Sequence, residues 1–337
     1  MRRGFLLAAG FGTRLRPLTN HRPKPLTPVC GVPMLDHAAA LLVTHGIEAA
    51  VVNAHHLPEQ IESWAEDHHL DLHVSVEVPE ILGTGGGLRL ALPQLADPFV
   101  VVNGDILSDV DLTGLLDLGD QDLACMALRE KGPTDRYGEV RADATGTVVD
   151  LVGLAHADGE PVSGTHFTGV HALTHELVER LPATGESCIV RQAYVSAVPE
   201  RRVAARLHRG AWFDVGTPEA YLRANLLACE GTLRLPLDPM SRASIARRPG
   251  AQKGTIPSGV QIAGSVWIGP GAVLEPGCQL GPGAIIGPGA HIGPGARVRE
   301  SVVWDGCSVP AGADLRRAIV YDGGLLETER RPSASAD

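Results

Sequence analysis

Two aspartates in this 337-residue chain occupy positions where a carboxylate can bind a metal ion. Asp105 ends the segment 100–105, whose apolar start is typical of a buried strand, and an unpaired charge at such a place is costly. Asp214 lies just before Thr217-Pro218-Glu219, a pattern typical of a helix start. Mg²⁺ usually binds through one or two carboxylates plus phosphate oxygens. We therefore expect Asp105 and Asp214 to hold Mg²⁺ jointly; a turn or helix-cap role for Asp105 is the alternative.

A glycine turn with cations beside it follows the first apolar run of the chain. Gly10, Gly12 and Thr13 come directly after that run, and Arg14 and Lys24 follow them, the lysine between two prolines. Glycine lets backbone amides approach phosphate oxygens, and the cations neutralise them. The sequence lacks the third glycine of a dinucleotide fingerprint and the Gly-Lys-Ser/Thr end of a Walker A loop. The combination favours a polyphosphate-binding loop over a plain tight turn.

Gly83, Thr84 and Gly85 belong to a second glycine-rich segment, 82–87, which precedes an expected helix. Because glycines allow a close backbone approach to a flat ligand, we expect this segment to contact a nucleobase; a flexible lid is the alternative. The histidines do not combine with a third ligand at zinc spacing. The Gly-x-Ser-x-Gly motif of a serine nucleophile is also missing from the sequence.

The elements that must position these residues alternate between strand and helix in the first part of the chain. Strand-like runs at 5–8, 50–53, 72–77 and 99–103 alternate with helical patterns near 35–44, 59–67 and 86–92. Further strands are expected after residue 121, and a last helix near 218–228. This order predicts an α/β domain with a doubly wound, mixed sheet over residues 1–230. In such a sheet, ligands bind at the carboxyl ends of the strands.

The last part of the chain carries a six-residue repeat. Its apolar positions are Ile262, Ile268, Leu274, Leu280, Ile286, Ile292, Val298 and Trp304, with a slip near Pro310. The repeat is too rich in glycine and proline for a helix, and its period fits a parallel β-helix of about three turns with these residues inside. We expect a linker over 231–257, the β-helix over 258–322 and a disordered tail over 323–337.

The overall composition argues against several classes of protein. With 29 basic and 39 acidic residues the net charge is −10, which disfavours broad binding to nucleic acid or to an anionic membrane. No run approaches the roughly 20 apolar residues that span a bilayer. The six cysteines show no Cys-x-x-Cys spacing, so reduced thiols and a cytoplasmic location are expected.

The motifs together resemble a known family. The segment 7–19 with Pro23-Lys24-Pro25 resembles the signature of the sugar-1-phosphate nucleotidyltransferases, or NDP-sugar pyrophosphorylases. Segments 82–87, 103–105 and 212–218 follow in the order of that family, so the resemblance covers about residues 3–230. The hexapeptide repeat resembles the left-handed β-helix appended to several members, including mannose-1-phosphate guanylyltransferases.

The resemblance implies both a reaction and the residues for it. A sugar 1-phosphate oxygen attacks the α-phosphorus of a nucleoside triphosphate, and pyrophosphate leaves. The residues implied for catalysis are Arg14, Lys24 and Asp105, with Asp105 and Asp214 on Mg²⁺. Those implied for the nucleotide are Ala9, Gly10, Gly12, Thr13, Gly83, Thr84 and Gly85. Those implied for the sugar phosphate are Gly138, Glu139, Thr168 and Gly169.

One family feature is missing from the sequence. Members usually carry Glu-Lys-Pro after a mid-domain strand, with the lysine on the sugar phosphate, but no lysine occurs here between Lys131 and Lys253. Arg136 and Arg141 are the candidates for that charge. The gap leaves a non-catalytic subunit that binds sugar nucleotides as an alternative to an enzyme.

The resemblance also suggests substrates and partners. GTP with mannose 1-phosphate is the expected pair, and UTP with an N-acetylated amino-sugar 1-phosphate is the alternative, because the segment 77–87 also resembles such uridylyltransferases. An acyltransferase in the β-helix would need a catalytic histidine, and only His291 lies in the repeat. Formation of a homo-oligomer through the β-helix, or packing of the β-helix against the catalytic domain, is the expectation instead.

Overall fold

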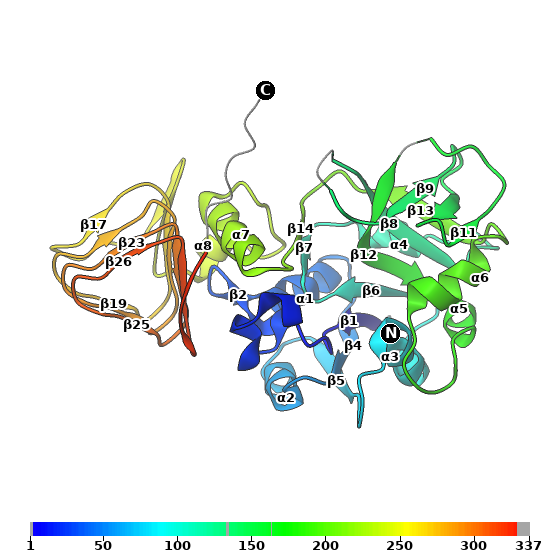
Figure 1. The fold of residues 1–337 in the computed structure, drawn as a ribbon, viewed down its shortest axis with the longest axis horizontal. Helices are drawn as coiled ribbons and strands as arrows, with labels where there is room; N and C mark the ends of the chain where they lie inside the picture. Colours follow the sequence, from blue (N-terminus) through cyan, green and yellow to red (C-terminus); the bar gives the residue numbers. More distant parts are fainter. Residues whose placement is uncertain (1–2, 133–134, 163, 329–337) are drawn as a thin grey trace. The chain divides into compact units, whose positions relative to one another are not determined.

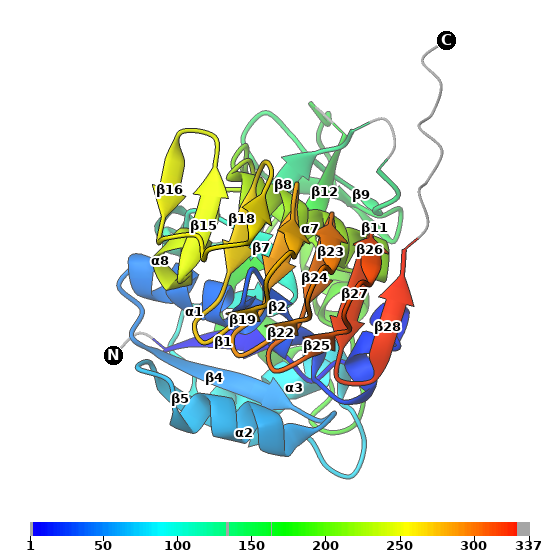
Figure 2. The ribbon, with the colours of Figure 1, turned by 90° about the vertical axis from the view of Figure 1, so that its left-hand side faces the viewer.

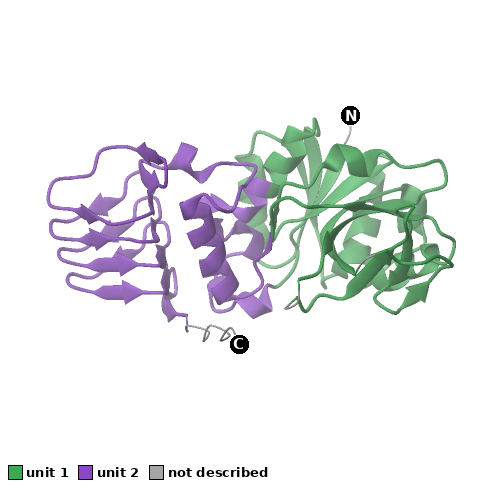
Figure 3. Ribbon diagram, turned by 90° about the horizontal axis from the view of Figure 1, so that it is seen from above, with its two compact units in different colours: residues 1–11, 38–212 green, residues 12–37, 213–337 purple. Residues whose placement is uncertain are grey.

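The computed structural model of the chain describes residues 3–132, 135–162 and 164–328 (Figure 1). The chain forms two compact units (Figure 3): unit 1 comprises residues 1–11 and 38–212, and unit 2 comprises residues 12–37 and 213–337. The chain therefore crosses between the units after Phe11, His37 and Trp212. The first crossing divides the glycine turn, because Gly10 belongs to unit 1 and Gly12 to unit 2.

Unit 1 is built on a ten-stranded mixed sheet. Its parallel part runs to one edge, in the order β6 (Phe99–Asn103), β1 (Arg3–Leu7), β4 (Ala49–Ala54) and β5 (Asp71–Val76). The remaining strands are β8 (Ala124–Glu130), β9 (Glu139–Ala142), β10 (Val148–Leu151), β11 (Ala155–His156), β12 (Thr165–Leu173) and β13 (Val203–Leu207). β12 is antiparallel to β6, which makes the sheet mixed as predicted.

Helices and apolar strand residues enclose the core of unit 1. The helices are α2 (Pro58–Glu66), α3 (Gly83–Ala91), α4 (Leu112–Leu116), α5 (His175–Glu179) and α6 (Val195–Ala197), with helical turns at Leu92–Gln94 and Ile189–Tyr194; α1 (Met34–Thr44) begins in unit 2. Phe5, Val51 and Val101 come from three neighbouring strands and pack with Leu88 of α3. The helix predicted near 86–92 begins earlier, at Gly83, so the glycine cluster forms its first turn.

Unit 2 contains the predicted parallel β-helix, whose short strands stack in three sheets (Figures 1 and 2). One sheet holds β17 (Gln261–Ile262), β20 (Gln279–Leu280), β23 (Arg297–Arg299) and β26 (Asp314–Arg316). The second holds β18 (Val266–Ile268), β21 (Ala284–Ile286), β24 (Ser301–Val303) and β27 (Ala318–Tyr321). The third holds β19 (Val273–Leu274), β22 (His291–Ile292) and β25 (Ser308–Val309).

The repeat slips at a different place from the one predicted. Leu280 pairs with Val298, eighteen residues on, but Ile286 pairs with Val303, only seventeen residues on. The lost residue therefore lies between Val298 and Ser301, where Glu300 adopts a left-handed φ of 46°. Val303 consequently joins the buried interior, and Trp304, which the repeat places inside, is not part of that cluster.

The remaining elements of unit 2 come before or after the β-helix in the sequence. They are β2 (Pro28–Val29), β3 (Val32–Pro33), α7 (Pro218–Glu230), α8 (Pro239–Arg242), β15 (Ile245–Arg248), β16 (Ala251–Lys253) and β28 (Gly324–Glu327), while β14 (Trp212–Asp214) spans the unit boundary. Residues 231–257 thus contain regular structure, and β15 pairs with β18. Of the tail at 323–337, residues beyond Thr328 lie outside the described residues. None of the helices in the described ranges has the length and apolarity that crossing a membrane requires.

Candidate functional site

The backbone after β1 is held by a side chain from the neighbouring strand. Asn53, near the end of β4 and almost fully buried, accepts hydrogen bonds through Oδ1 from Ala8 N at 2.7 Å and Ala9 N at 3.3 Å. Gly10 follows directly, is exposed, and has open space where a side chain would start. The start of the predicted phosphate loop is therefore fixed, and its glycine leaves room for a ligand.

A buried carboxylate connects this loop to helix α3. Glu77 is fully buried, and its Oε1 accepts a hydrogen bond from Asn53 Nδ2 at 2.7 Å while its Oε2 accepts one from Leu82 N at 2.7 Å. A methyl group on Gly87 would overlap Oε1 of Glu77. Glycine at position 87 is thus needed because the carboxylate takes the space of a side chain.

The other glycines of α3 also pack against the protein itself. Gly85 N donates to Ser187 O at 2.8 Å, and a Cβ on Gly85 would stand 2.7 Å from Ser187 Oγ. A Cβ on Gly86 would stand 2.6 Å from Gly185 O, and Thr84 Oγ1 accepts from Ile189 N at 3.2 Å. The side-chain-free faces of Gly85 and Gly86 therefore serve packing, and contact of Gly83, Thr84 and Gly85 with a base stays a prediction.

Asp105 stands two residues beyond the end of β6, next to a bulged part of β12. Gly104 N donates to Leu7 O at 2.9 Å, which ties this turn to the end of β1. The pairing of β12 with β8 shifts between Phe167 and His171. Gly169, inside the shift, has a left-handed φ of 83°, and a Cβ there would meet Asn103 Nδ2 at 2.6 Å. The bulge thus requires a glycine beside the strand end that carries Asp105.

Aromatic side chains gather around Thr168. The Thr168 hydroxyl donates to Ala127 O at 2.9 Å, and Trp212 Nε1 donates to Thr168 O at 2.8 Å. His166 stacks on Tyr137 with ring centroids 4.7 Å apart and lies 4.8 Å from the ring of Trp212. The Thr168 hydroxyl is therefore used inside the protein, and the partly exposed rings of Tyr137 and Trp212 offer a flat apolar surface.

The predicted sugar residue Glu139 is paired with a cation. Its carboxylate lies 2.7 Å from the guanidinium of Arg141, and this hydrogen bond, together with the charges of Arg141 and Lys131, lowers the pKa of Glu139. Where the family lysine is missing, Val152 and Leu154 are exposed, and Val152 packs against Gly138. Of the two predicted cations, Arg136 and Arg141, the structure thus brings Arg141 to Glu139.

In unit 2 the predicted phosphate loop continues as three short helical turns. They are Thr13–Leu15, Leu18–Asn20 and Lys24–Leu26. Gly12 has a left-handed φ of 61°, and a Cβ there would stand 2.9 Å from Cβ of Lys24 and 3.0 Å from Cγ2 of Thr19. Thr19 Oγ1 donates to Gly12 O at 2.9 Å. The loop therefore closes on the stem of Lys24, which is 7% exposed.

Arg14 lies beside the start of α7. A Cβ on Gly216 would stand 3.3 Å from Nη1 of Arg14, so the guanidinium rests on backbone two residues after Asp214. Thr217 caps α7 by accepting a hydrogen bond from Ala220 N at 3.3 Å. The cap orients the segment that carries Asp214, and the structure brings Arg14 and this segment together within unit 2.

The predicted residues are divided between the units. Unit 1 holds Ala9, Gly10, Gly83, Thr84, Gly85, Asp105, Gly138, Glu139, Thr168 and Gly169, and unit 2 holds Gly12, Thr13, Arg14, Lys24 and Asp214. Across 3–132, 135–162 and 164–328, no group of three or more His, Cys, Asp or Glu is arranged to hold a metal ion. A site in which two carboxylates and the phosphate oxygens of a substrate are the ligands would nevertheless suit Mg²⁺.

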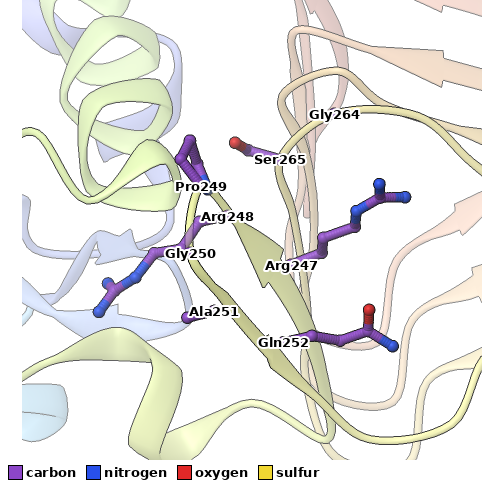
Figure 4. A pocket seen from close by; sticks show the side chains of 8 residues that line it. All are labelled: Arg247, Arg248, Pro249, Gly250, Ala251, Gln252, Gly264 and Ser265. Atoms are coloured by element: carbon purple, nitrogen blue, oxygen red, sulfur yellow. The ribbon is translucent and has the colours of Figure 1, made fainter.

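Sequence reasoning missed Asn53 as a positioning residue, and it used Glu77 only as part of a family resemblance. The sequence feature that could have identified Asn53 is a polar residue near the end of an otherwise apolar strand. Residues 99–103, which end in Asn103, show the same pattern. A described pocket beside the β15–β16 hairpin, with Arg247, Gln252 and Ser265 in its lining (Figure 4), includes none of the predicted residues.

Comparisons with known proteins agree with this architecture. A family described as "Nucleotidyl transferase" matches residues 3–231, and one described as "GMPPB C-terminal domain" matches residues 262–328. Mannose-1-phosphate guanylyltransferase of Mycobacterium tuberculosis is 30% identical over 283 residues, which are 80% of this chain and 77% of that protein. N-acetylmuramate alpha-1-phosphate uridylyltransferase of Neisseria meningitidis serogroup B is 32% identical over 234 residues, which are 67% of this chain and 98% of that protein.

A solved structure supports the fold. The crystal structure of HddC from Yersinia pseudotuberculosis complexed with GMP-PN superposes with a TM-score of 0.54 at 23% identity, covering 67% of this chain and 98% of that one. At this level of identity the likeness concerns the fold alone.

Proposed function

This chain belongs to the nucleotidyl transferase family as a sugar-1-phosphate nucleotidyltransferase, and we propose that it transfers the guanylyl group of GTP to mannose 1-phosphate. The observation that carries the choice of substrates is the second family match, at residues 262–328, together with guanylyltransferase relatives that match about 80% of the chain. The contacts of Gly12 with Lys24 and of Arg14 with Gly216 support a phosphate-binding role for this loop.

The reaction needs no covalent intermediate with the protein. An oxygen of the sugar phosphate forms a bond to the α-phosphorus while the bond to the pyrophosphate oxygen breaks, so catalysis is positioning and charge neutralisation. In this proposal Gly10, Gly12 and Thr13 offer backbone amides to the triphosphate. Arg14 and Lys24 neutralise the departing pyrophosphate.

Asp105 and Asp214 are the proposed ligands of Mg²⁺. When bound, the ion supplies neutralisation of phosphate charge. The proposal extends to Gly83, Thr84 and Gly85 at the base, and to Gly138, Glu139, Thr168 and Gly169 at the sugar phosphate. Glu139 is held at its carboxylate by Arg141, so it is oriented before a sugar arrives.

A second substrate pair has its own support. The Neisseria meningitidis uridylyltransferase matches along 98% of its length, and its name gives N-acetylmuramate α-1-phosphate as its substrate. Val152 and Leu154 are 42% and 52% exposed at the place where the family lysine is missing. An apolar surface there suits a sugar whose substituent ends in a methyl group, such as an N-acetyl group.

One substrate matrix tests both pairs. The protein is incubated with Mg²⁺, each of four nucleoside triphosphates, and mannose, glucose, N-acetylglucosamine or N-acetylmuramate 1-phosphate, and pyrophosphate release is followed. GTP with mannose 1-phosphate is expected to give the highest kcat/KM. Asp105→Asn and Asp214→Asn should each lower turnover by orders of magnitude with an unchanged unfolding temperature. Release from no pair contradicts the proposal, and a preference for UTP with an amino sugar selects the second pair.

Two further expectations accompany this proposal. All six cysteines lie in the described residues as free thiols, in keeping with a cytoplasmic location. Self-association through the β-helix is tested by light scattering on the whole chain and on a variant ending before residue 258.

A further inference from the structure

Arg22, in the loop between the glycine turn and Lys24, is held by the β-helix. Its guanidinium carbon lies 4.4 Å from the centroid of the Trp304 ring, in the geometry of a cation–π contact. Its two terminal nitrogens lie 2.9 and 3.3 Å from the carboxylate oxygens of Asp305, and one of them also lies 3.2 Å from Asp322. The side chain is only 17% exposed, so these contacts are partly shielded from solvent.

Trp304 is itself fixed in place. Its Nε1 donates to the hydroxyl of Tyr221 in α7 at 2.8 Å, and that hydroxyl donates to the carbonyl of Pro28, farther along the same loop. Trp304 and Tyr221 are almost fully buried. Because the indole can take few other positions, the plane on which Arg22 rests is rigid.

Two more contacts fasten the far part of the loop. Cys30 N donates to Asn225 Oδ1 at 2.8 Å, and Asn225 belongs to α7. The ring of Trp267, from β18, occupies the space where Gly31 would carry a side chain. Three separated places in the loop are thus attached to α7 or to the β-helix, and all of them belong to unit 2.

The chain between Arg22 and Lys24 is stiff. Pro23 and Pro25 flank the lysine, and a proline ring fixes its own φ and restricts the residue before it. The stem of Lys24 packs under Gly12, so a displacement of Lys24 would also displace the glycine turn. Fixing Arg22 therefore fixes the position of both phosphate-binding parts of the loop.

We propose that Arg22 is a positioning residue for nucleotidyl transfer, through which Trp304 and Asp305 of the β-helix hold Lys24 and Gly12 in place for the triphosphate. This inference rests on the proposed function for its catalytic part. It gives the β-helix a role in the reaction although none of the predicted substrate contacts lies in the β-helix. A small misplacement of a catalytic group can cost about 100-fold in rate.

The test compares Arg22→Ala with a matched variant, Arg299→Ala, in the whole chain. Arg299 pairs with Asp314 at 2.6 Å within the β-helix, so its loss also removes an ion pair of this domain. Arg22→Ala is expected to lower kcat/KM for the triphosphate 10- to 100-fold with an unchanged KM for the sugar phosphate. Arg22→Lys, which keeps the charge but not the stacked plane, should recover part of the loss. Arg299→Ala should match the wild type.

Hydrogen exchange provides a readout that does not depend on activity. Amides of residues 12–27 are expected to exchange faster in Arg22→Ala than in Arg299→Ala, while amides of the β-helix strands exchange equally in both. Equal exchange at 12–27, or a fall in activity that only follows a fall in unfolding temperature, overturns the inference. A wild type inactive with every substrate pair overturns the proposed function instead, and exchange then decides whether Arg22 holds the loop.

Discussion

Asn53 and Glu77 meet through one hydrogen bond, from Asn53 Nδ2 to Glu77 Oε1 at 2.7 Å, in the buried interior of unit 1. Oδ1 of Asn53 accepts a hydrogen bond from Ala8 N, and Oε2 of Glu77 accepts one from Leu82 N. This pair therefore joins the backbone before Gly10 to the backbone before α3. Both places are predicted to touch the nucleotide, so the pair sets their spacing.

Glu77→Gln should destabilise unit 1 and weaken nucleotide binding. The new amide group would face either Asn53 Nδ2 or Leu82 N, and a donor facing a donor leaves a buried group unsatisfied, at a cost of about 1–3 kcal/mol. Chemical unfolding and the KM for the triphosphate measure the two effects. Glu80→Gln, at an exposed position three residues on, serves as control. Equal stability of the two variants would show that the bond does not matter.

Gly10 and Gly12 should respond differently to alanine. Gly10 has open space around its Cβ position and a φ outside the left-handed region, so Gly10→Ala should stay within about 1 kcal/mol of wild-type stability. Gly12→Ala should lose about 1–2 kcal/mol or more because its φ of 61° is left-handed and its Cβ position crowds Lys24.

Activity separates the two glycines further. If phosphate oxygens approach Gly10, Gly10→Ala loses at least tenfold in kcat/KM while keeping its fold. Unfolding curves and initial rates on the same preparations give both quantities. Full activity in Gly10→Ala would place the triphosphate elsewhere.

Arg141→Gln should affect the sugar phosphate more than the nucleotide. Arg141 holds Glu139, and it is one of two cations considered in place of the missing lysine. Loss of a charge-assisted bond from Arg141 is expected to raise the KM for the sugar phosphate roughly tenfold. The KM for the triphosphate should not change. Arg136→Gln is the matched control, and a larger effect there would reverse the assignment.

His37→Leu should reduce the loss of unfolding free energy that accompanies a drop in pH. Burial lowers the pKa of His37 to about 4, and neither ring nitrogen has a hydrogen-bond partner within the described part of the chain. Because the folded pKa lies below the unfolded value of about 6.5, the unfolded state binds more protons, and stability falls as pH drops through that range. The contribution is about 2 kcal/mol between neutral pH and pH 5.

Urea unfolding of both proteins at pH 7.5 and pH 5 measures this difference. The wild type should lose about 2 kcal/mol more than His37→Leu over the interval. Wild type and variant still share His171, whose pKa burial lowers to about 3, so the variant retains part of the slope. An identical loss in both proteins would contradict the assignment to His37.

The elements of the fold could be predicted because their signals are local. The six-residue repeat predicts the β-helix, and the alternation of strand and helix predicts the mixed sheet, both of which the structure confirms. The helix start at Thr217-Pro218 also appears as expected. In each case the pattern is set by neighbours in sequence, so no tertiary information is needed.

The contacts that position the candidate site could not be predicted in this way. Asn53 and Glu77 are 24 residues apart, and Arg22 lies far from Trp304 in sequence. Nothing in the local pattern of either pair shows that they meet, because the meeting depends on strand order and on the register of the β-helix. The glycines at 83–87 also pack against Ser187 and Glu77, a use of their conformational freedom that the local sequence does not show.

The seventeen-residue spacing between Ile286 and Val303 decides which of two neighbours, Val303 or Trp304, lies inside the β-helix. In a coil of eighteen residues, the position aligned with Ile286 would be residue 304, and the indole would turn into the narrow interior. A deletion of one residue between Val298 and Val303, in a coil that stays seventeen residues long, would bring Trp304 into register with Ile286 and exchange a stacking surface for an overfilled interior. Coil length, more than composition, is the quantity to compare when asking which relatives share this arrangement.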